Sequence, residues 1–143
     1  MPLTDEEIHA LMRDRSQQLP CARHLGFELL DFSVDEGWAE MAFHPRAEFA
    51  NPAGAVQSGF VGAMLDDAMS VAAGISQRFA MTVPTMQTTV THLRPTPIER
   101  VMVRANVLRF GPASVVMQGA LRGSDGTTLA AALSHAVPRP MPD

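Results

Sequence analysis

The longest apolar stretch of the chain, residues 54–77, predicts the central element of the fold. Almost all of its positions are hydrophobic or small, and two adjacent carboxylates, Asp66 and Asp67, lie near its middle. Its hydrophobic positions recur at helical spacing, so we predict a helix over residues 58–78 with a length of about 30 Å. Because this helix is apolar nearly all round, we expect it to be buried inside the molecule.

One flank of the predicted helix combines a charge with small side chains. The flank that carries Asp66 is otherwise formed by Gly59, Gly62, Ser70 and Ala73. Small residues let a strand, a partner helix or a ligand approach closely. A charge in such an apolar setting is costly unless it is paired, hydrated or used in chemistry. Asp66 is therefore a candidate functional residue, whereas Asp67 is expected to be a structural charge or a charge at the rim.

The rest of the chain predicts one short helix and six strands. Residues 4–18 form an amphipathic pattern that begins with a capping box of Thr4 and Glu7 and ends before Pro20. Runs rich in Val, Thr and Leu, separated by turn residues, predict strands over residues 26–32, 37–43, 83–93, 101–110, 114–121 and 127–137. The regular spacing of the last four strands indicates an antiparallel meander. We expect the proline-rich tail, residues 138–143, to be frayed.

The predicted order of elements indicates a fold class. After the first helix come two strands, a loop over residues 44–57, the long helix and four strands. A strongly twisted antiparallel sheet that curls around one apolar helix is an economical way to bury that helix, so we predict an α+β fold. The length of 143 residues predicts a single domain over residues 1–143.

Composition narrows the class of protein. The chain is 46% hydrophobic and 18% charged with a net charge of -4, which argues against disorder and against a nucleic-acid-binding protein. The low charge content indicates that another subunit covers part of the surface. Cys21 is the only cysteine and the five histidines show no ligand spacing, so we predict neither a disulfide framework nor a metal site.

The chain shows no sign of membrane insertion or export. Its N-terminal residues are acidic and lack the layout of a signal peptide, which favours the cytoplasm. In a membrane, Asp66 and Asp67 would each cost roughly 2.5–3.5 kcal/mol, so residues 54–77 are not expected to span one.

The loop and the start of the long helix carry a motif. The run Asn51-Pro-Ala-Gly-Ala-Val-Gln-Ser-Gly-Phe-Val-Gly-Ala-Met-Leu-Asp66 leads from this loop into the predicted helix. In this run, and over about residues 27–137 as a whole, the chain resembles the PaaI-like acyl-CoA thioesterases, which have the hotdog fold. Members of that family carry an Asn or Gln, a Gly, a His-Gly-Gly at the helix start, and an acidic residue nine positions after the His. The matching positions here are Asn51, Gly54, Gln57, Ser58, Gly59 and Asp66. Two of them depart from the family pattern, because Gln57 replaces the histidine and Ser58 replaces the glycine that follows it.

The resemblance implies a role for each matching residue. The backbone N–H of Ser58, with Gly59 as a second candidate, would donate to the oxyanion, because a helix N-terminus offers unpaired N–H groups. Asp66 would be the general base or the nucleophile, and Asn51 would orient the water or the carbonyl. Gln57 can hydrogen-bond a thioester carbonyl or a neighbouring loop, but it cannot carry a positive charge.

Three further positions complete the implied site. Thr85 matches a family position whose hydroxyl helps to hold the water, and Ser70, one turn beyond Asp66, is a weaker candidate. Arg94 and Arg109 are the arginines best placed to bind the phosphates of coenzyme A, which enters as part of the substrate and not as a cofactor.

Helix geometry requires a second chain at such a site. Ser58 and Asp66 lie eight residues apart, which is about 12 Å along a helix axis, so one carbonyl carbon does not meet both within one subunit. We therefore predict an obligate homodimer, or a homotetramer of two dimers, with sites shared across the subunit interface as in the family it resembles.

Several alternatives remain open at this point. Asp66 would be purely structural if it paired with an arginine; Asn51 would be an ordinary turn residue, Thr85 an ordinary strand residue, and both arginines surface residues. The favoured function is hydrolysis of a small or medium acyl-CoA, aromatic groups included. The alternative is a non-catalytic acyl-CoA-binding or regulatory hotdog protein. It stays open because Gln57 stands where the family has a histidine. A hotdog hydratase would need an Asp/His pair, and no histidine lies at a matching place.

Overall fold

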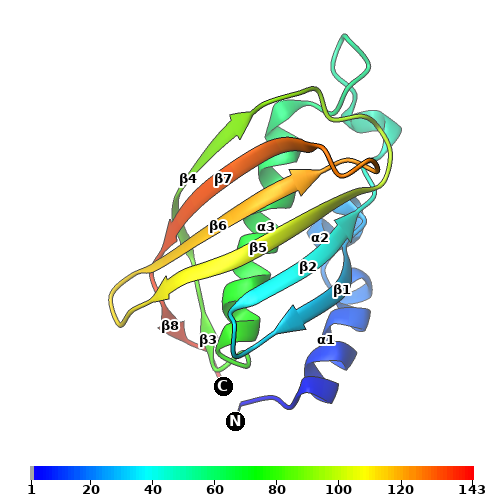
Figure 1. Cartoon of the computed structure of the whole chain (residues 1–143). Coiled ribbons are helices and arrows are strands. Elements are labelled where there is room, and N and C mark those ends of the chain that lie inside the picture. The colour runs from blue at the N-terminus through cyan, green and yellow to red at the C-terminus, as the bar shows by residue number, and fades with distance from the viewer. Residues whose placement is uncertain (1) are drawn as a thin grey trace.

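The computed structural model describes residues 2–143 as a curved antiparallel sheet packed against one long helix (Figure 1). The helices are α1 (Asp5–Gln18), α2 (Pro20–Leu25), the 3-10 turn η1 (Ala47–Phe49) and α3 (Ser58–Ser76). The strands are β1 (Glu28–Ser33), β2 (Trp38–Phe43), β3 (Met81–Thr82), β4 (Thr85–His92), β5 (Val101–Phe110), β6 (Val115–Arg122), β7 (Thr128–Ala136) and β8 (Arg139–Pro140). The predicted α+β hotdog architecture, a curved sheet around a long helix, is confirmed.

The six main strands lie in the order β1-β2-β5-β6-β7-β4. β5, β6 and β7 form the predicted meander, but the prediction is wrong for β4, which pairs with β7 at the far edge. The reason is the segment that follows β4: the N–H groups of Leu93 and Arg94 both donate to Leu129 O, and Val56 N–H donates to Thr96 O. This segment therefore crosses the end of the sheet before it enters β5, where a tight hairpin would have placed β4 beside β5.

The N-terminal helix begins at the predicted capping box. Thr4 N–H donates to Glu7 Oε2 at 2.8 Å, and Glu7 N–H donates to Thr4 Oγ1 at 3.2 Å. The helix ends at Gln18, and Pro20 then starts a second helix, α2, which the sequence pattern did not reveal because proline also favours a first helical position. Gly26 ends α2 with a φ of 68°, so the first strand begins at Glu28, two residues later than predicted.

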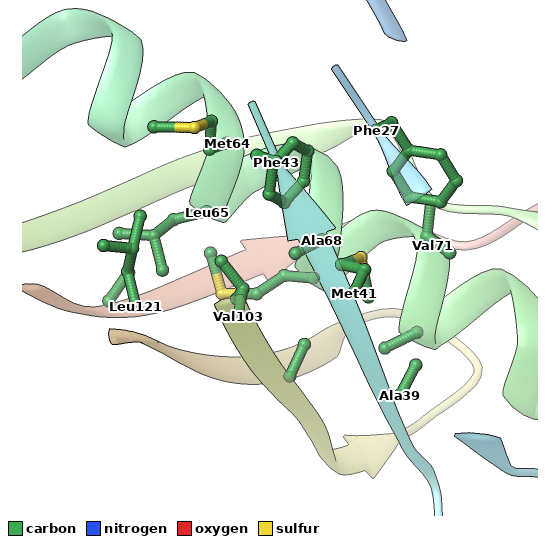
Figure 2. Close-up of a cluster of buried hydrophobic side chains, with 14 of the residues drawn as sticks. Phe27, Ala39, Met41, Phe43, Met64, Leu65, Ala68, Val71, Val103 and Leu121 are labelled. Atoms are coloured by element: carbon green, nitrogen blue, oxygen red, sulfur yellow. The ribbon is translucent and has the colours of Figure 1, made fainter. Parts of the chain in front are cut away.

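The long helix α3 fills the concave side of the sheet. Its side chains include Met64, Leu65 and Ala68, all fully buried, and they pack against side chains of β2, β5 and β6 (Figure 2). A side chain such as Leu65 contributes about 1.5–3 kcal/mol by its burial. Gly119 of β6 makes room for the helix, because a Cβ there would lie 3.3 Å from atoms of Leu65 and Met69.

The C-terminal tail is ordered by a short strand pair. β8 pairs with β3, with Met81 opposite Pro140 and Thr82 opposite Arg139. Met141 N–H also donates to Ala80 O at 3.1 Å. The prediction of a frayed tail is therefore wrong at residues 139–141, because the segment that follows α3 offers an edge with which the tail pairs.

Two general findings concern residues 2–143. No helix in this range is long and apolar enough to cross a membrane. No group of three or more His, Cys, Asp or Glu side chains in this range is arranged to hold a metal ion.

Candidate active site

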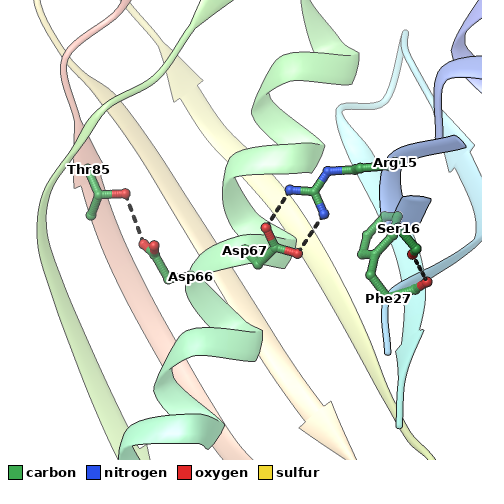
Figure 3. Close-up of polar contacts among 6 residues, drawn as sticks. All are labelled: Arg15, Ser16, Phe27, Asp66, Asp67 and Thr85. Carbon is green, nitrogen blue, oxygen red and sulfur yellow. Dashed lines mark hydrogen bonds and ion pairs between the residues drawn. The ribbon is translucent and has the colours of Figure 1, made fainter. Parts of the chain in front are cut away.

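The carboxylate of Asp66 lies on the side of α3 that faces β4 (Figure 3). One of its oxygens, Oδ1, accepts hydrogen bonds from Thr85 Oγ1 at 2.9 Å and from Thr88 Oγ1 at 3.3 Å. The other oxygen, Oδ2, accepts none from the residues that the structure describes. The two threonines therefore orient the half-buried carboxylate while one oxygen stays free to accept a proton or to act as a nucleophile.

A bulge in β4 brings both threonines to the same carboxylate. Val90 packs inward against the core, so strict alternation along β4 would place Thr88 inward and Thr85 outward. The register of β4 shifts between Thr85 and Gln87, which reverses the direction of Thr85 and leaves Met86 67% exposed. The sequence did not reveal this bulge, although it ranked Thr85 as a site residue through the family resemblance.

Two residues of this hydrogen-bond network were missed. Thr88 Oγ1 lies 3.1 Å from Ser134 Oγ, and Ser134 Oγ donates to Gln87 O at 3.2 Å. Ser134 is fully buried in an otherwise alanine-rich strand. Two sequence signals were available. One is a lone serine in an alanine-rich strand, and the other is that Thr88 lies two residues from the apolar Val90 and therefore points to the same face of β4.

The neighbouring carboxylate, Asp67, is used structurally, as predicted. Arg15 of α1 donates two hydrogen bonds to it, at 2.5 and 2.9 Å, on the opposite side of α3 from Thr85 (Figure 3). The side chains are only 12% and 14% exposed, and the guanidinium also stacks over Phe27 at 4.5 Å. Arg15 therefore pairs with Asp67, and among the described residues no arginine forms an ion pair with Asp66, whose side-chain partners are Thr85 and Thr88.

The N-terminus of α3 offers one free backbone donor. Gln57 is the N-cap, and its Oε1 accepts the Gly59 N–H at 2.7 Å. The Gly59 N–H is thereby occupied within the chain, whereas the Ser58 N–H has no acceptor among residues 2–143. Ser58 is exposed, so its N–H is accessible to a ligand.

Asn51 shapes the loop that leads to this helix. Its Oδ1 accepts the N–H groups of Ala53 and Ala55, both at 3.0 Å, and its own N–H donates to Ala55 O at 2.7 Å. The turn requires Gly54, which has a φ of 82°. Because the side-chain oxygen Oδ1 of Asn51 already accepts two N–H groups of the loop, only the side-chain NH₂ remains to contact a ligand.

Two cavities lie along α3, one at each half. The first, of about 410 Å³, brings together Asn51, Gln57, Ser58 and Arg94 at the N-terminus of α3, and we call it the N-terminal cavity. The second, of about 400 Å³, lies along the C-terminal half of α3 and is lined by residues that include Ser70 and Thr85; we call it the C-terminal cavity. Within one chain, the structure therefore unites Asn51, Gln57, Ser58 and Arg94, and separately Asp66 and Thr85.

The two candidate phosphate-binding arginines lie far apart in one chain. Arg94 follows β4 near the start of β7, whereas Arg109 pairs with Val116 at the opposite end of the sheet. Both are exposed. The charge of Arg94 is a minor contributor to the lowered pKa of Asp125, which is due first to the Thr127 backbone N–H.

Known proteins share this fold and this sequence pattern. The model of the Thioesterase superfamily matches residues 53–130. A phenylacetic acid degradation-related protein of Ralstonia eutropha JMP134 is similar in structure, with a TM-score of 0.80 and 25% identity over 88% of this chain and 98% of that one.

Two further solved structures share the fold at lower identity. The PaaI protein from the phenylacetic acid degradation operon of Escherichia coli has a TM-score of 0.80 and 17% identity, covering 92% of this chain and 93% of that one. The smu.793 protein of Streptococcus mutans UA159, solved bound to acetyl CoA, has a TM-score of 0.72 and 14% identity, covering 82% and 91%. A search of curated proteins finds no match.

The family match covers more than half of the chain, and its limits include both Ser58 and Asp66. The fold around those residues is also the fold of the structural neighbours. The chain therefore belongs to the thioesterase superfamily, a family of thioester hydrolases, and has the hotdog fold of its PaaI-like members.

Proposed function

We propose that this protein hydrolyses acyl-CoA thioesters of small or medium acyl groups, aromatic ones included, to the free acid and CoA. The observation that carries the proposal is the state of Asp66: two threonines hold one carboxylate oxygen and leave the other free. The second support is the free N–H of Ser58 at the positive end of α3, beside the N-terminal cavity.

The unpaired edge of β4 supports a homodimer. β4 ends the sheet, and its eight residues, TMQTTVTH, include no acidic residue, no Lys or Arg and no proline. The bulge of β4 lies at its first residues, between Thr85 and Gln87, and leaves the rest of the strand regular, whereas the opposite edge strand, β1, carries Glu28 and Asp31 and shifts register between Leu29 and Asp31. Since charges and bulges normally protect an edge from pairing, β4 is the edge suited to pair with a second copy.

The geometry of α3 supports a particular two-fold axis. Gly62 lies midway between Ser58 and Asp66, four residues from each, and a Cβ at Gly62 would lie 3.8 Å from Val90 of β4. A dyad near this level exchanges the two positions, so Asp66 of one chain meets Ser58 of its partner. Gly59, which has no side chain, and Ala63, which has a small one, are exposed, and this allows the close approach of a partner.

The reaction then follows from the groups in place. With Asp66 as general base, water loses a proton to Oδ2 and attacks the thioester carbon, and the Ser58 N–H of the other chain binds the developing oxyanion. The C–S bond breaks, and the thiolate of CoA takes the proton from Asp66. With Asp66 as nucleophile, the carboxylate first displaces CoA to form an anhydride, which water hydrolyses.

Residues of the N-terminal cavity are proposed to hold the CoA portion. Arg94 lies beside Ser58 and Gln57 there and would contact a phosphate, whereas Arg109, the second arginine proposed from the sequence, lies outside this cavity. The acetyl CoA bound to the Streptococcus mutans neighbour supports CoA as the carrier of the acyl group.

The test is turnover of an acyl-CoA panel followed with a thiol-detecting reagent. We expect wild type to release CoA, and Asp66→Asn to lower kcat about 10²–10⁴-fold with the oligomeric state unchanged by sedimentation. Full activity in Asp66→Asn would exclude the proposed role of this carboxylate.

A second candidate function is supported by Gln57. Its side chain caps Gly59 and cannot become a cation in place of the family histidine, so acyl-CoA binding without hydrolysis is the alternative. Ligand recovered intact after long incubation with wild type would favour this binding role.

A further inference from the structure

Ser134 of β7 carries a buried hydroxyl that the reaction described above does not use. Its side chain is fully buried, and the nearest residues on the same face of the strand, Ala132 and Ala136, are buried alanines. A buried hydroxyl costs free energy unless it makes a hydrogen bond. The contacts of Ser134 therefore indicate why a serine, and not another alanine, lies at this position.

The pairing of β7 with β4 places Ser134 directly opposite Thr88. Their hydroxyl oxygens lie 3.1 Å apart, and Thr88 Oγ1 in turn lies 3.3 Å from Asp66 Oδ1. Ser134 lines neither the N-terminal nor the C-terminal cavity. It is thus connected to the proposed catalytic carboxylate through one hydroxyl and does not contact a ligand in either cavity.

The two hydroxyls have fewer hydrogens than they have acceptors in reach. Each hydroxyl has one hydrogen to donate. Thr88 has two acceptors, Asp66 Oδ1 and Ser134 Oγ. Ser134 also has two, Thr88 Oγ1 and, at 3.2 Å, Gln87 O. The pair can therefore point toward Asp66, with Ser134 donating to Thr88, or away from it, with Thr88 donating to Ser134.

The carboxylate of Asp66 favours the direction toward itself. A carboxylate accepts a hydrogen bond more strongly than a hydroxyl does, so the Thr88 hydrogen is directed to Asp66 Oδ1. With that hydrogen committed, the 3.1 Å contact between Thr88 and Ser134 is favourable only if Ser134 donates. A hydroxyl that donates to a charged group also becomes a better acceptor, which favours Thr88 Oγ1 over Gln87 O as the acceptor of the Ser134 hydrogen.

The direction away from Asp66 would have the opposite effect on the site. If Thr88 donated to Ser134, its hydrogen would be withdrawn from Asp66 Oδ1. An alanine in place of Ser134 would then remove the competing acceptor and return the Thr88 hydrogen to the carboxylate. The two directions therefore predict opposite effects of the same substitution.

We propose that Ser134 is a positioning residue for Asp66: its buried hydroxyl donates to Thr88 and thereby directs the Thr88 hydrogen to Asp66 Oδ1. This inference rests on the proposed function for the use of Asp66 in catalysis. The direction of the two hydroxyls is a property of the protein without substrate.

Ser134→Ala tests the role by steady-state kinetics. Alanine already occupies the neighbouring buried positions of this face, so the variant is expected to fold. We expect kcat to fall about threefold with KM nearly unchanged, because Thr88 keeps its own hydrogen but loses the donor that orients it. A kcat equal to or above that of wild type would overturn the proposal, since the opposite direction predicts that result.

A double-mutant cycle separates an effect through Thr88 from a general structural effect. Thr88→Val removes the hydroxyl through which Ser134 is proposed to act, so adding Ser134→Ala to this variant should leave kcat unchanged. A further loss of about threefold in the double variant would mean that the two residues act independently. Ser134 would then act by another route, such as its contact with Gln87 O, and the proposal would be overturned.

Ser76→Ala is the matched control. Ser76 Oγ donates to Ala73 O at 2.7 Å at the last residue of α3, so this substitution also removes a serine hydroxyl that lies against a backbone carbonyl. Ser76 makes no hydrogen bond to Thr88 or Asp66, and its kcat and KM should match wild type. A loss as large as that in Ser134→Ala would contradict a specific role of Ser134.

Neutron diffraction from crystals of the deuterated protein tests the direction without turnover. We expect the deuterium of Ser134 to point to Thr88 Oγ1 and that of Thr88 to point to Asp66 Oδ1. A Thr88 deuterium directed to Ser134 Oγ, or a Ser134 deuterium directed to Gln87 O, would overturn the proposal even in an active thioesterase. In a protein that releases no CoA, the expected deuterium positions would support the directed pair of hydroxyls and contradict hydrolysis.

Discussion

At the scale of single residues, the site depends on how the two oxygens of Asp66 are used. The hydroxyls of Thr85 and Thr88 donate to Oδ1, and Thr88 Oγ1 lies 3.1 Å from the hydroxyl oxygen of the buried Ser134. A carboxylate fixed in this way keeps its free oxygen in one direction. Thr88 is therefore expected to act as a positioning residue without touching the substrate.

Replacing Thr88 by valine tests this positioning role. Valine keeps the shape and the strand preference of threonine but removes the hydrogen bond to a charged oxygen, a loss of about 1.5 kcal/mol. We expect kcat to fall about tenfold with KM nearly unchanged, measured by steady-state kinetics. Thr89→Val, an exposed position of the same strand, is the control and should leave both constants unchanged. Equal losses in the two variants would contradict the role of Thr88.

At the scale of elements, α1 is fixed to α3 by charge as well as by apolar packing. Arg15 and Asp67 join residues 52 positions apart in the sequence, and Ile8 and Met12 pack into the core. Breaking a poorly exposed ion pair on one side leaves a charge without compensation. This contact therefore makes the stability of the protein depend on its N-terminal helix.

Arg15→Met measures this dependence. We expect the variant to lose about 2–4 kcal/mol of unfolding free energy in urea, because Asp67 remains 14% exposed without its cation. The double variant Arg15→Met with Asp67→Leu should recover most of the loss, since neither charge remains. A double variant less stable than Arg15→Met would show that the pair itself is not the cause.

The capping box of α1 gives a pH dependence of known sign. The pKa of Glu7 lies below its ordinary value of 4.5, first because of the Thr4 backbone N–H and then because of the Thr4 hydroxyl. Folding thus favours the carboxylate, so this stabilisation is present above the unfolded-state pKa and is lost as pH falls through the folded-state pKa.

Glu7→Gln should accordingly lower the urea midpoint at neutral pH, and the difference from wild type should shrink as the pH falls below the ordinary Glu pKa of 4.5. Glu6→Gln, in the same helical turn but outside the capping box, is the control. A Glu7→Gln effect of the same size at every pH would contradict a role for the charge.

The elements that the sequence predicted well are those defined by local interactions. The capping box joins Thr4 to Glu7, and the apolar pattern of α3 is continuous, so short-range rules were sufficient. The position of β4 beside β7, the pairing of β8 with β3 and the contact of Arg15 with Asp67 all join distant segments. No periodicity contains that information, and the β4 bulge that turns Thr85 toward Asp66 likewise depends on the partner strand.

At the scale of the whole molecule, one chain contains two separated parts of the proposed site. The free Ser58 N–H lies at one end of α3, and Asp66 lies about 12 Å along the same helix. The sequence predicted this separation because it depends only on helix geometry. The predicted solution, a second chain related by a two-fold axis, can be tested without knowledge of the interface.

Mixing two inactive variants tests the shared site directly. Asp66→Asn removes the carboxylate, and Ser58→Pro removes the backbone N–H of Ser58. Proline suits this first helical position, and Gln57 before it, with φ -60° and ψ 137°, already has a conformation that precedes proline. Each variant alone should therefore fold but have little activity.

After the two variants are unfolded together and refolded, half of the dimers should be mixed. Each mixed dimer contains one site with both changes and one site with neither, so about one quarter of wild-type activity should return. If Ser58 and Asp66 of the same chain formed the site, every site in the mixture would carry a change and the activity would stay near zero. The recovered activity thus measures how the two-fold axis distributes the site between chains.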